Sequence, residues 1–516
     1  MCRGVPWCPL VALGAAAISL FTSAAAVAQV AAEARGGPQL GAIGHGLPAE
    51  NDFTAESLRR VQRELTAAHG GDFRNIPLDV KAEHLEWVLV RYLMAPTGLV
   101  HRVHLPSDVG EPPQYAVGED DVTWNGALLA ALSFKYAVTR DAETRVLIGR
   151  VLDGLHLAQQ ATGQKGLIAR CVMRSDVPVG KATRRYTAPD GTVSHVVSDA
   201  AKGTINQVVA GYAAMMMFVY DDLPAETQER AREDLAALVG HLVDHKYQLT
   251  EADGKHTEFG DLRPLIGTVS VPFNAQVAYT IIAAGHHFPG RDLIRVKMIR
   301  REYERLREKH HVYYESPLRN LAPPQVVSSM AFIKGMNDRN HVHNAAFIGL
   351  LLECHACRKA GTKPDPRFVY ELGQTLFWTM EAIQHERNAL CNFMWAGLLT
   401  HPDLFPHLVP GREGRARQQF PYVIATGLEQ LRRCPVDRFF YPGNDVETRE
   451  PQWVDAQKPH QSYHWKAGGY SKYVVTGPPQ NSLSISVDYL YAYWLMRYFR
   501  LDEALEHVRR ALEVRP

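Results

Sequence analysis

Residues 120–162 read DDVTWNGALLAALSFKYAVTRDAETRVLIGRVLDGLHLAQQAT, and this stretch decides the fold class. Its first part is apolar over most of its length. Its second part repeats apolar residues at i, i+3, i+4 and i+7, which is the pattern of an amphipathic helix. The connecting segment VTRDAETR is a short turn that offers an Asp as the start of the second helix. The stretch therefore predicts a helical hairpin.

Similar pairs of helical segments follow along the chain. A segment that is apolar all round, such as VVAGYAAMMMFVY at 208–220, is typical of a buried inner helix. An amphipathic segment, such as AETQERAREDLAALVGHLVDH at 225–245, is typical of an outer helix. About six pairs predict an all-α fold, an (α/α)6 toroid of paired helical hairpins. The predicted helices span 54–69, 78–94, 123–139, 142–162, 205–221, 225–246, 272–286, 291–309, 340–360, 367–387, 415–433 and 483–513.

Two small β-hairpin insertions interrupt the helices. RRYTAPDGTVSHVVSD at 184–199 and KYQLTEADGKHTEFGD at 246–261 each place Asp-Gly between residues of alternating polarity. Asp-Gly between two such runs is a strong hairpin signal. Because both segments lie between helix pairs, we expect the hairpins at one rim of the ring, where they shape a cleft.

The N-terminus has the pattern of a secretory signal. Arg3 precedes the apolar run PLVALGAAAISLF, and Ala26-Val27-Ala28 precedes a predicted cleavage site before Gln29. The predicted organisation is a signal peptide at 1–28, a polar, Gly-rich flexible arm at 29–52 and the toroid domain at 53–516. The mature chain is expected to be secreted or periplasmic.

The composition argues against nucleic acid and against membrane insertion as partners. With 56 Lys and Arg, 55 Asp and Glu and a formal net charge of +1, the chain has no basic block, so nucleic acid is not an expected partner. No later run is long and apolar enough to cross a bilayer, so no membrane insertion is expected after signal cleavage. The composition leaves the oligomeric state open.

The segment ECHACRK places Cys354 and Cys357 one helical turn apart. Zinc requires more ligands at set spacings, and the chain has no second CxxC pair. We therefore expect either two core cysteines or a local disulfide. No metal and no cofactor are predicted.

Polar and aromatic residues gather at the predicted starts of inner helices and in the loops between pairs. Aromatic side chains suit the CH faces of sugars, and planar hydrogen-bonding groups suit their hydroxyls, so the predicted partner is a carbohydrate. A ring mouth lined by such loops is a typical ligand site. The substrate-binding candidates are Asp120, Trp124, Arg170, Asn206, Arg339, Asn340, His343, Trp395, Trp465 and Asp488.

Glycoside hydrolysis requires two carboxyl groups, one as acid and one as base or nucleophile. Asp121 and Asp261 are the predicted pair, with Glu258 in reserve; their structural alternative is a helix cap and a solvent-exposed hairpin charge. His341 with Tyr463 is the alternative pair, for β-elimination from a uronic acid whose carboxylate Asn340 or Arg339 would neutralise. A metal pair of His341 and His343 is a further alternative, less favoured than simple hydrogen bonding.

Several segments resemble secreted bacterial proteins of the six-hairpin glycosidase-like superfamily: DDVTWNGALLAALSFKYAVTRD, ATGQKGLIARCVM, YQLTEADGKHTEFGD and DYLYAYWLMRYFRLD. The resemblance covers about residues 80 to 500 and implies an (α/α)6 toroid with a saccharide-handling cleft. Relatives often carry an acidic residue in the segment that matches SDAAKGTINQVVAGY. Here Lys202, Gly203 and Thr204 stand in its middle and only Asp199 is acidic. The expected function is a secreted glycoside hydrolase, with a polysaccharide lyase or a non-catalytic saccharide-binding protein as alternatives.

Overall fold

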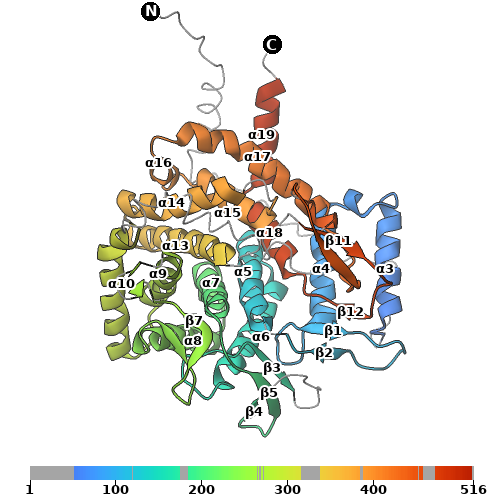
Figure 1. Ribbon diagram of the computed structural model, residues 1–516, viewed down its shortest axis with the longest axis horizontal. Coiled ribbons are helices and arrows are strands. Elements are labelled where there is room, and N and C mark those ends of the chain that lie inside the picture. Colours follow the sequence, from blue (N-terminus) through green and yellow to red (C-terminus); the bar gives the residue numbers. More distant parts are fainter. Residues whose placement is uncertain are drawn as a thin grey trace, which may run out of the picture.

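The protein, described by a computed structural model, is mostly helical, with small antiparallel sheets between the helices (Figure 1). The predicted signal peptide and nearly all of the predicted arm lie outside the described residues. The structure describes residues 52–118, 120–174, 184–263, 265–266, 269–270, 272–314, 338–383, 387–450, 452–456 and 471–513.

One set of helices forms the core. Every residue of α7 from Thr204 to Met217 is buried, as its uniformly apolar sequence predicts. Contacts lead from α5 to α7, α9, α13, α15 and α18 in turn, and from α18 back to α5. These core helices are α5 (Asp121–Thr139), α7 (Lys202–Phe218), α9 (Pro272–His287), α13 (Asp338–Ala360), α15 (Ala389–Thr400) and α18 (Val487–Tyr498).

Several other helices pack against this set, and α6 among them is amphipathic. In α6, Leu147, Val151 and Leu155 are buried on one face, while the intervening residues include exposed positions. None of the helices that the structure describes combines the length and the hydrophobicity needed to cross a bilayer. The remaining helices are α3 (Ala55–Ala68), α4 (Leu78–Val88), α6 (Ala142–Gln160), α8 (Ala225–Asp244), α10 (Leu293–Tyr314), α14 (Pro366–Ile383), α16 (Phe405–Leu408), α17 (Glu413–Arg432) and α19 (Leu501–Glu513).

Two helix predictions were wrong. The sequence analysis missed α15, whose residues from Ala389 to Leu398 are all buried. A short helix that is apolar all round has no polar face, so its period is invisible in the sequence. The predicted single helix at 483–513 is two helices, α18 and α19, because the chain turns at Arg500, whose φ is 52°.

Both predicted hairpins are confirmed, and the structure adds strands that the sequence analysis missed. In Figure 1 the β3–β5–β4 sheet projects from the lower edge, below α5 and α7. The sheets have the strand orders β12–β1–β2, β3–β5–β4, β6–β7, β8–β9 and β10–β11. The strands are β1 (Arg102–His104), β2 (Gln114–Ala116), β3 (Cys171–Arg174), β4 (Arg184–Thr187), β5 (Val193–Val197), β6 (Gln248–Thr250), β7 (His256–Asp261), β8 (Leu265–Ile266), β9 (Val269–Ser270), β10 (Gly443–Glu447), β11 (Ser471–Val475) and β12 (Ser482–Leu483).

The helices α5 and α7 approach each other through glycines. A Cβ added at Gly211 would lie 2.4 Å from the carbonyl oxygen of Gly126, so even alanine would force the two backbones apart. We expect Gly211→Ala to lower the free energy of unfolding by about 1–3 kcal/mol, the usual effect of overpacking.

Gly149 in α6 is the matched control for this substitution, because an added Cβ there has no neighbour within 4 Å. We expect Gly149→Ala to raise stability by roughly 0.5–1 kcal/mol through helix propensity. Urea unfolding followed by circular dichroism measures both effects. Equal effects at the two positions would contradict the close approach of α5 and α7.

Candidate functional site

The helices α5, α7 and α13 begin next to one another. The Thr123 hydroxyl near the start of α5 donates to the Thr204 hydroxyl near the start of α7, at 3.1 Å. The Asn206 amide of α7 donates to the carbonyl oxygen of His341 in α13, also at 3.1 Å. The His341 ring lies over Gly203, where a Cβ would be 2.5 Å from Nε2. Three inner helices therefore present their N-terminal ends to one region.

The β6–β7 hairpin lies against the segment that enters α7. The Thr257 hydroxyl donates to the Ala200 carbonyl at 2.7 Å, and the Glu258 backbone N–H donates to an Asp199 carboxylate oxygen at 2.8 Å. The Asp261 carboxylate at the end of β7 pairs with Arg263 at 2.6 Å. Hydrogen bonds from Arg263 hold the pKa of Asp261 below its usual range, and Lys202 contributes in the same direction. Asp261 is therefore an ionised, half-buried carboxylate near the start of α7.

The β3–β5–β4 sheet holds the start of α5 from another side. The Arg170 backbone N–H donates to the Val197 carbonyl at 2.9 Å, and the Arg170 carbonyl accepts from Val122 N–H at 3.0 Å. The Arg170 guanidinium pairs with Asp120 at 3.3 Å. Asp120 occupies the N-cap position of α5 and makes no side-chain capping bond there. Its half-exposed carboxylate serves the ion pair instead.

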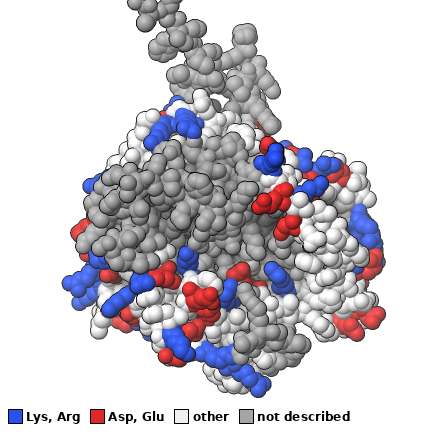
Figure 2. All heavy atoms as spheres, in the orientation of Figure 1, with Lys and Arg blue, Asp and Glu red and all other residues white. Residues whose placement is uncertain are grey.

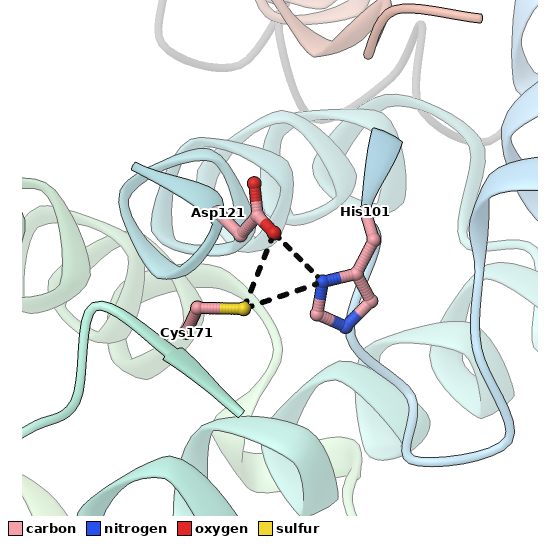
Figure 3. Close-up of side chains that lie close together, drawn as sticks. All are labelled: His101, Asp121 and Cys171. Atoms are coloured by element: carbon pink, nitrogen blue, oxygen red, sulfur yellow. Dashed lines mark hydrogen bonds and ion pairs between the residues drawn. The ribbon is translucent and has the colours of Figure 1, made fainter. Parts of the chain in front are cut away.

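Asp121 lies in a buried cluster with His101 and Cys171 (Figure 3). Its Oδ2 atom is 2.8 Å from His101 Nδ1 and 3.4 Å from Cys171 Sγ, and it accepts from Gly118 N–H at 3.0 Å. Asp121 is 2% exposed, and both of its side-chain neighbours are fully buried. Burial and the Asp121 carboxylate raise the pKa of the Cys171 thiol well above its ordinary value, so this thiol is a poor nucleophile.

The predicted catalytic pair is not brought together by shared contacts. Asp121 binds His101, while Asp261 binds Arg263. Glu258 has an exposed side chain on β7, three residues before Asp261. Tyr463, the predicted partner of His341, lies outside the described residues.

Several predicted substrate-binding residues lie in the core instead of at a surface. Trp395 is fully buried inside α15, and Asp488 is buried 3.5 Å from Arg438. His343 is fully buried and contacts the Cys391 carbonyl, and burial lowers its pKa to about 4. The sequence analysis placed these residues at helix starts or in loops because it missed α15 and the depth of the inner helices.

Of the other predicted substrate-binding residues, some are buried and only two have a described side chain at this end of the helices. Trp124 is nearly buried, at 7% exposed, and Asn206 is buried beside His341. Arg339 and Asn340 belong to the first turn of α13, but only their backbone is described. Trp465 lies outside the described residues. Asp120 and Arg170 remain the predicted binding residues with a side chain at this end of the helices.

The cysteines that the structure describes are all free, so the local disulfide between Cys354 and Cys357 is absent from it. Cys354 is buried in α13, as a core cysteine is expected to be, and burial raises its pKa to about 12.

Across the described part of the face in Figure 2, acidic and basic side chains are interspersed, in agreement with the near-neutral charge.

The sequence analysis missed two members of the buried cluster, His101 and Cys171. They lie 20 residues before and 50 residues after Asp121, and no short motif joins such separations. Cys171 follows Arg170 in GLIARCVM. Arg170 was a predicted substrate-binding residue, whereas Cys171 was assigned no role.

Comparison with known proteins adds no assignment. No protein-family model matches the chain, and no curated protein matches its sequence.

Proposed function

We propose that the protein is an exported carbohydrate-active enzyme with an (α/α)6 toroid, and that it hydrolyses glycosidic bonds where α5, α7 and α13 begin. The cycle of contacts from α5 through α18 and back to α5 supports the ring. The alternation of fully buried and amphipathic helices supports an inner and an outer layer. The N-terminal signal pattern supports export.

The observation that carries the proposal is that the start of α5 and the β6–β7 hairpin both lie against the start of α7, through the Thr123–Thr204 and Thr257–Ala200 hydrogen bonds. Asp120 arrives from α5 with Arg170, and Asp261 arrives from β7 with Arg263. Both carboxylates are partly exposed and can reach a substrate, whereas the Asp121 carboxylate is enclosed. We therefore assign the acid and base roles to Asp120 and Asp261 and a supporting role to Asp121. Ionised Asp261 suits the base or nucleophile.

The test is digestion of a panel of polysaccharides and oligosaccharides by the full mature chain, read by chromatography of the products. Asp261→Asn should lower turnover roughly 100-fold, as expected for loss of a general base. Its fold should be retained, because the Asp261–Arg263 pair is partly exposed.

Asp253→Asn is the matched control. Asp253 lies at the turn of the same hairpin, and on the described chain its carboxylate bonds the exposed Lys255. Turnover by this variant should equal that of the natural protein. Equal losses in both variants, or no loss in Asp261→Asn, would remove Asp261 from catalysis.

A lyase is the second candidate, and one feature favours it. Lys202 adds positive charge in the first turn of α7, and together with the helix N-terminus it suits an anionic sugar such as a uronic acid. His341, half-buried beside Gly203, would then be the base. β-Elimination leaves an unsaturated product that absorbs ultraviolet light, and hydrolysis does not. Binding without either product would support the saccharide-binding alternative.

A further inference from the structure

We propose that His101, Asp121 and Cys171 bind a divalent transition metal ion, with zinc the expected occupant. Figure 3 shows the three side chains converging from the loop before β1, the start of α5 and the start of β3. Asp121 Oδ2 lies 2.8 Å from His101 Nδ1 and 3.4 Å from Cys171 Sγ, and the Nδ1 and Sγ atoms lie 3.9 Å apart. Ligand atoms around tetrahedral zinc lie roughly 3.3–3.6 Å from one another. One observed distance falls in this range, one is shorter and one is longer, so small side-chain shifts would fit the ion.

The backbone holds the three ligands in place before any ion binds. The Asn125 amide bonds both the N–H and the carbonyl of Val100, next to His101, and it donates to the Asp121 carbonyl at 2.8 Å. Cys171 pairs with Val197 in the β3–β5 ladder. Such supporting bonds orient metal ligands and raise affinity.

Gly118 completes this arrangement. A Cβ at Gly118 would lie 2.0 Å from Asp121 Oδ1, so the absence of a side chain makes room for the carboxylate. The Gly118 N–H also bonds Oδ2, which fixes the rotation of the carboxylate towards His101 and Cys171.

The ligand types select the metal. Thiolate, imidazole and carboxylate together suit zinc and neighbouring transition metals, whereas calcium and magnesium require several oxygen ligands. In the metal-free protein His101 Nδ1 donates to the Asp121 carboxylate, so binding requires that this proton move to Nε2 while the Cys171 thiol proton passes to solvent. The divalent charge then balances the thiolate and the Asp121 carboxylate, two negative charges in a site at most 2% exposed.

The expected role is structural. The ligands are enclosed, so a substrate does not reach the ion. The described residues supply three ligands, and a water molecule would take the fourth position, which in a typical structural zinc site belongs to a fourth side chain. An ion here would tie together three segments that are far apart in the sequence, and its ligands Asp121 and Cys171 directly follow the ion-paired residues Asp120 and Arg170. This inference does not depend on the proposed hydrolase activity, because it concerns binding alone.

The test uses the full mature chain stripped of metal with a chelator. Titration with zinc should load about one ion per chain, and cobalt should give the near-ultraviolet thiolate-to-metal absorption of a Cys-ligated site together with visible d–d bands. Zinc should also raise the midpoint of thermal unfolding, since a ligand that binds only the folded state stabilises it. No stoichiometric binding and no midpoint shift in the natural protein would overturn the proposal.

Substitutions assign the ion to this cluster. Cys171→Ser and His101→Gln should each weaken zinc binding at least 100-fold, and Gly118→Ala should weaken it about 10-fold. Cys391→Ser is the matched control, because Cys391 is another buried cysteine that forms no disulfide and lies in α15. It should retain the cobalt spectrum and the affinity. Unchanged binding by both cluster variants, or equal loss in the control, would place the ion elsewhere.

Discussion

Replacing Asp121 with Ala is expected to lower the free energy of unfolding by about 3–5 kcal/mol, because several buried groups lose their shared acceptor. The Asp121 carboxylate is the shared acceptor for His101, Cys171 and the Gly118 N–H. Each of these donors would be left buried without its acceptor, and His101 Nε2 already has no hydrogen-bond partner among the described residues. Urea unfolding of the metal-free protein, followed by circular dichroism, measures the loss.

Asp120→Ala is the matched control for this prediction. Asp120 is the preceding residue, but its side chain is 50% exposed and makes one ion pair, with Arg170. Its loss should change stability by less than about 1 kcal/mol. If Asp121→Ala unfolded like the natural protein while turnover fell by orders of magnitude, Asp121 would be a catalytic residue after all.

The contrast between Asp120 and Asp121 shows what the sequence could and could not predict. The apolar run after the two carboxylates predicts a buried helix, and every residue of α5 from Asp121 to Phe134 is buried. The sequence does not show which of two adjacent carboxylates turns inward. That choice depends on His101 and Cys171, which reach Asp121 only through tertiary packing. A local pattern contains no information about such contacts.

Helix prediction succeeded where one of two signals was present. An amphipathic period revealed outer helices such as α8, and long apolar runs revealed inner helices such as α7. The short helix α15 has neither signal, since it is buried on nearly every side and only a few turns long. The hairpins were predicted because Asp-Gly demands a specific turn, whereas the pairs β1–β2 and β10–β11 depend on contacts between strands separated by longer loops.

A second buried carboxylate, Glu353 of α13, joins three helices. Its Oε1 atom accepts hydrogen bonds from Tyr279 of α9 at 2.7 Å and from Tyr303 of α10 at 2.6 Å. His287 is 3.3 Å from the same oxygen, and Arg307 donates to Oε2 at 3.3 Å. The sequence analysis considered this segment only for its cysteines. Glu353 is 3% exposed, so its loss leaves several polar groups without their acceptor.

Glu353→Ala is therefore expected to lower the free energy of unfolding by about 3–5 kcal/mol. Glu304→Ala is the control, because Glu304 is exposed on α10 next to Tyr303 and should change stability by less than about 0.5 kcal/mol. Urea unfolding at neutral pH compares the two. A loss at Glu353 no larger than at Glu304 would show that the three helices do not depend on this carboxylate.

The same carboxylate should give the protein an acid-sensitive component of stability. Burial alone would raise the pKa of Glu353, but hydrogen bonds from His287, Tyr303 and Tyr279 outweigh it and lower the pKa from 4.5 to about 2. A pKa lowered in the folded state contributes stability that is complete above pH 4.5 and is lost as the pH falls through about 2. The shift corresponds to roughly 3 kcal/mol.

Since other carboxylates also titrate in this pH range, the measurement is the difference in unfolding free energy between the natural protein and Glu353→Gln at successive pH values. That difference should shrink as the pH falls from 4.5 towards 2, because the glutamine variant has no proton to bind at this position. A difference that stayed constant across this range would mean that Glu353 titrates alike in the folded and unfolded chains.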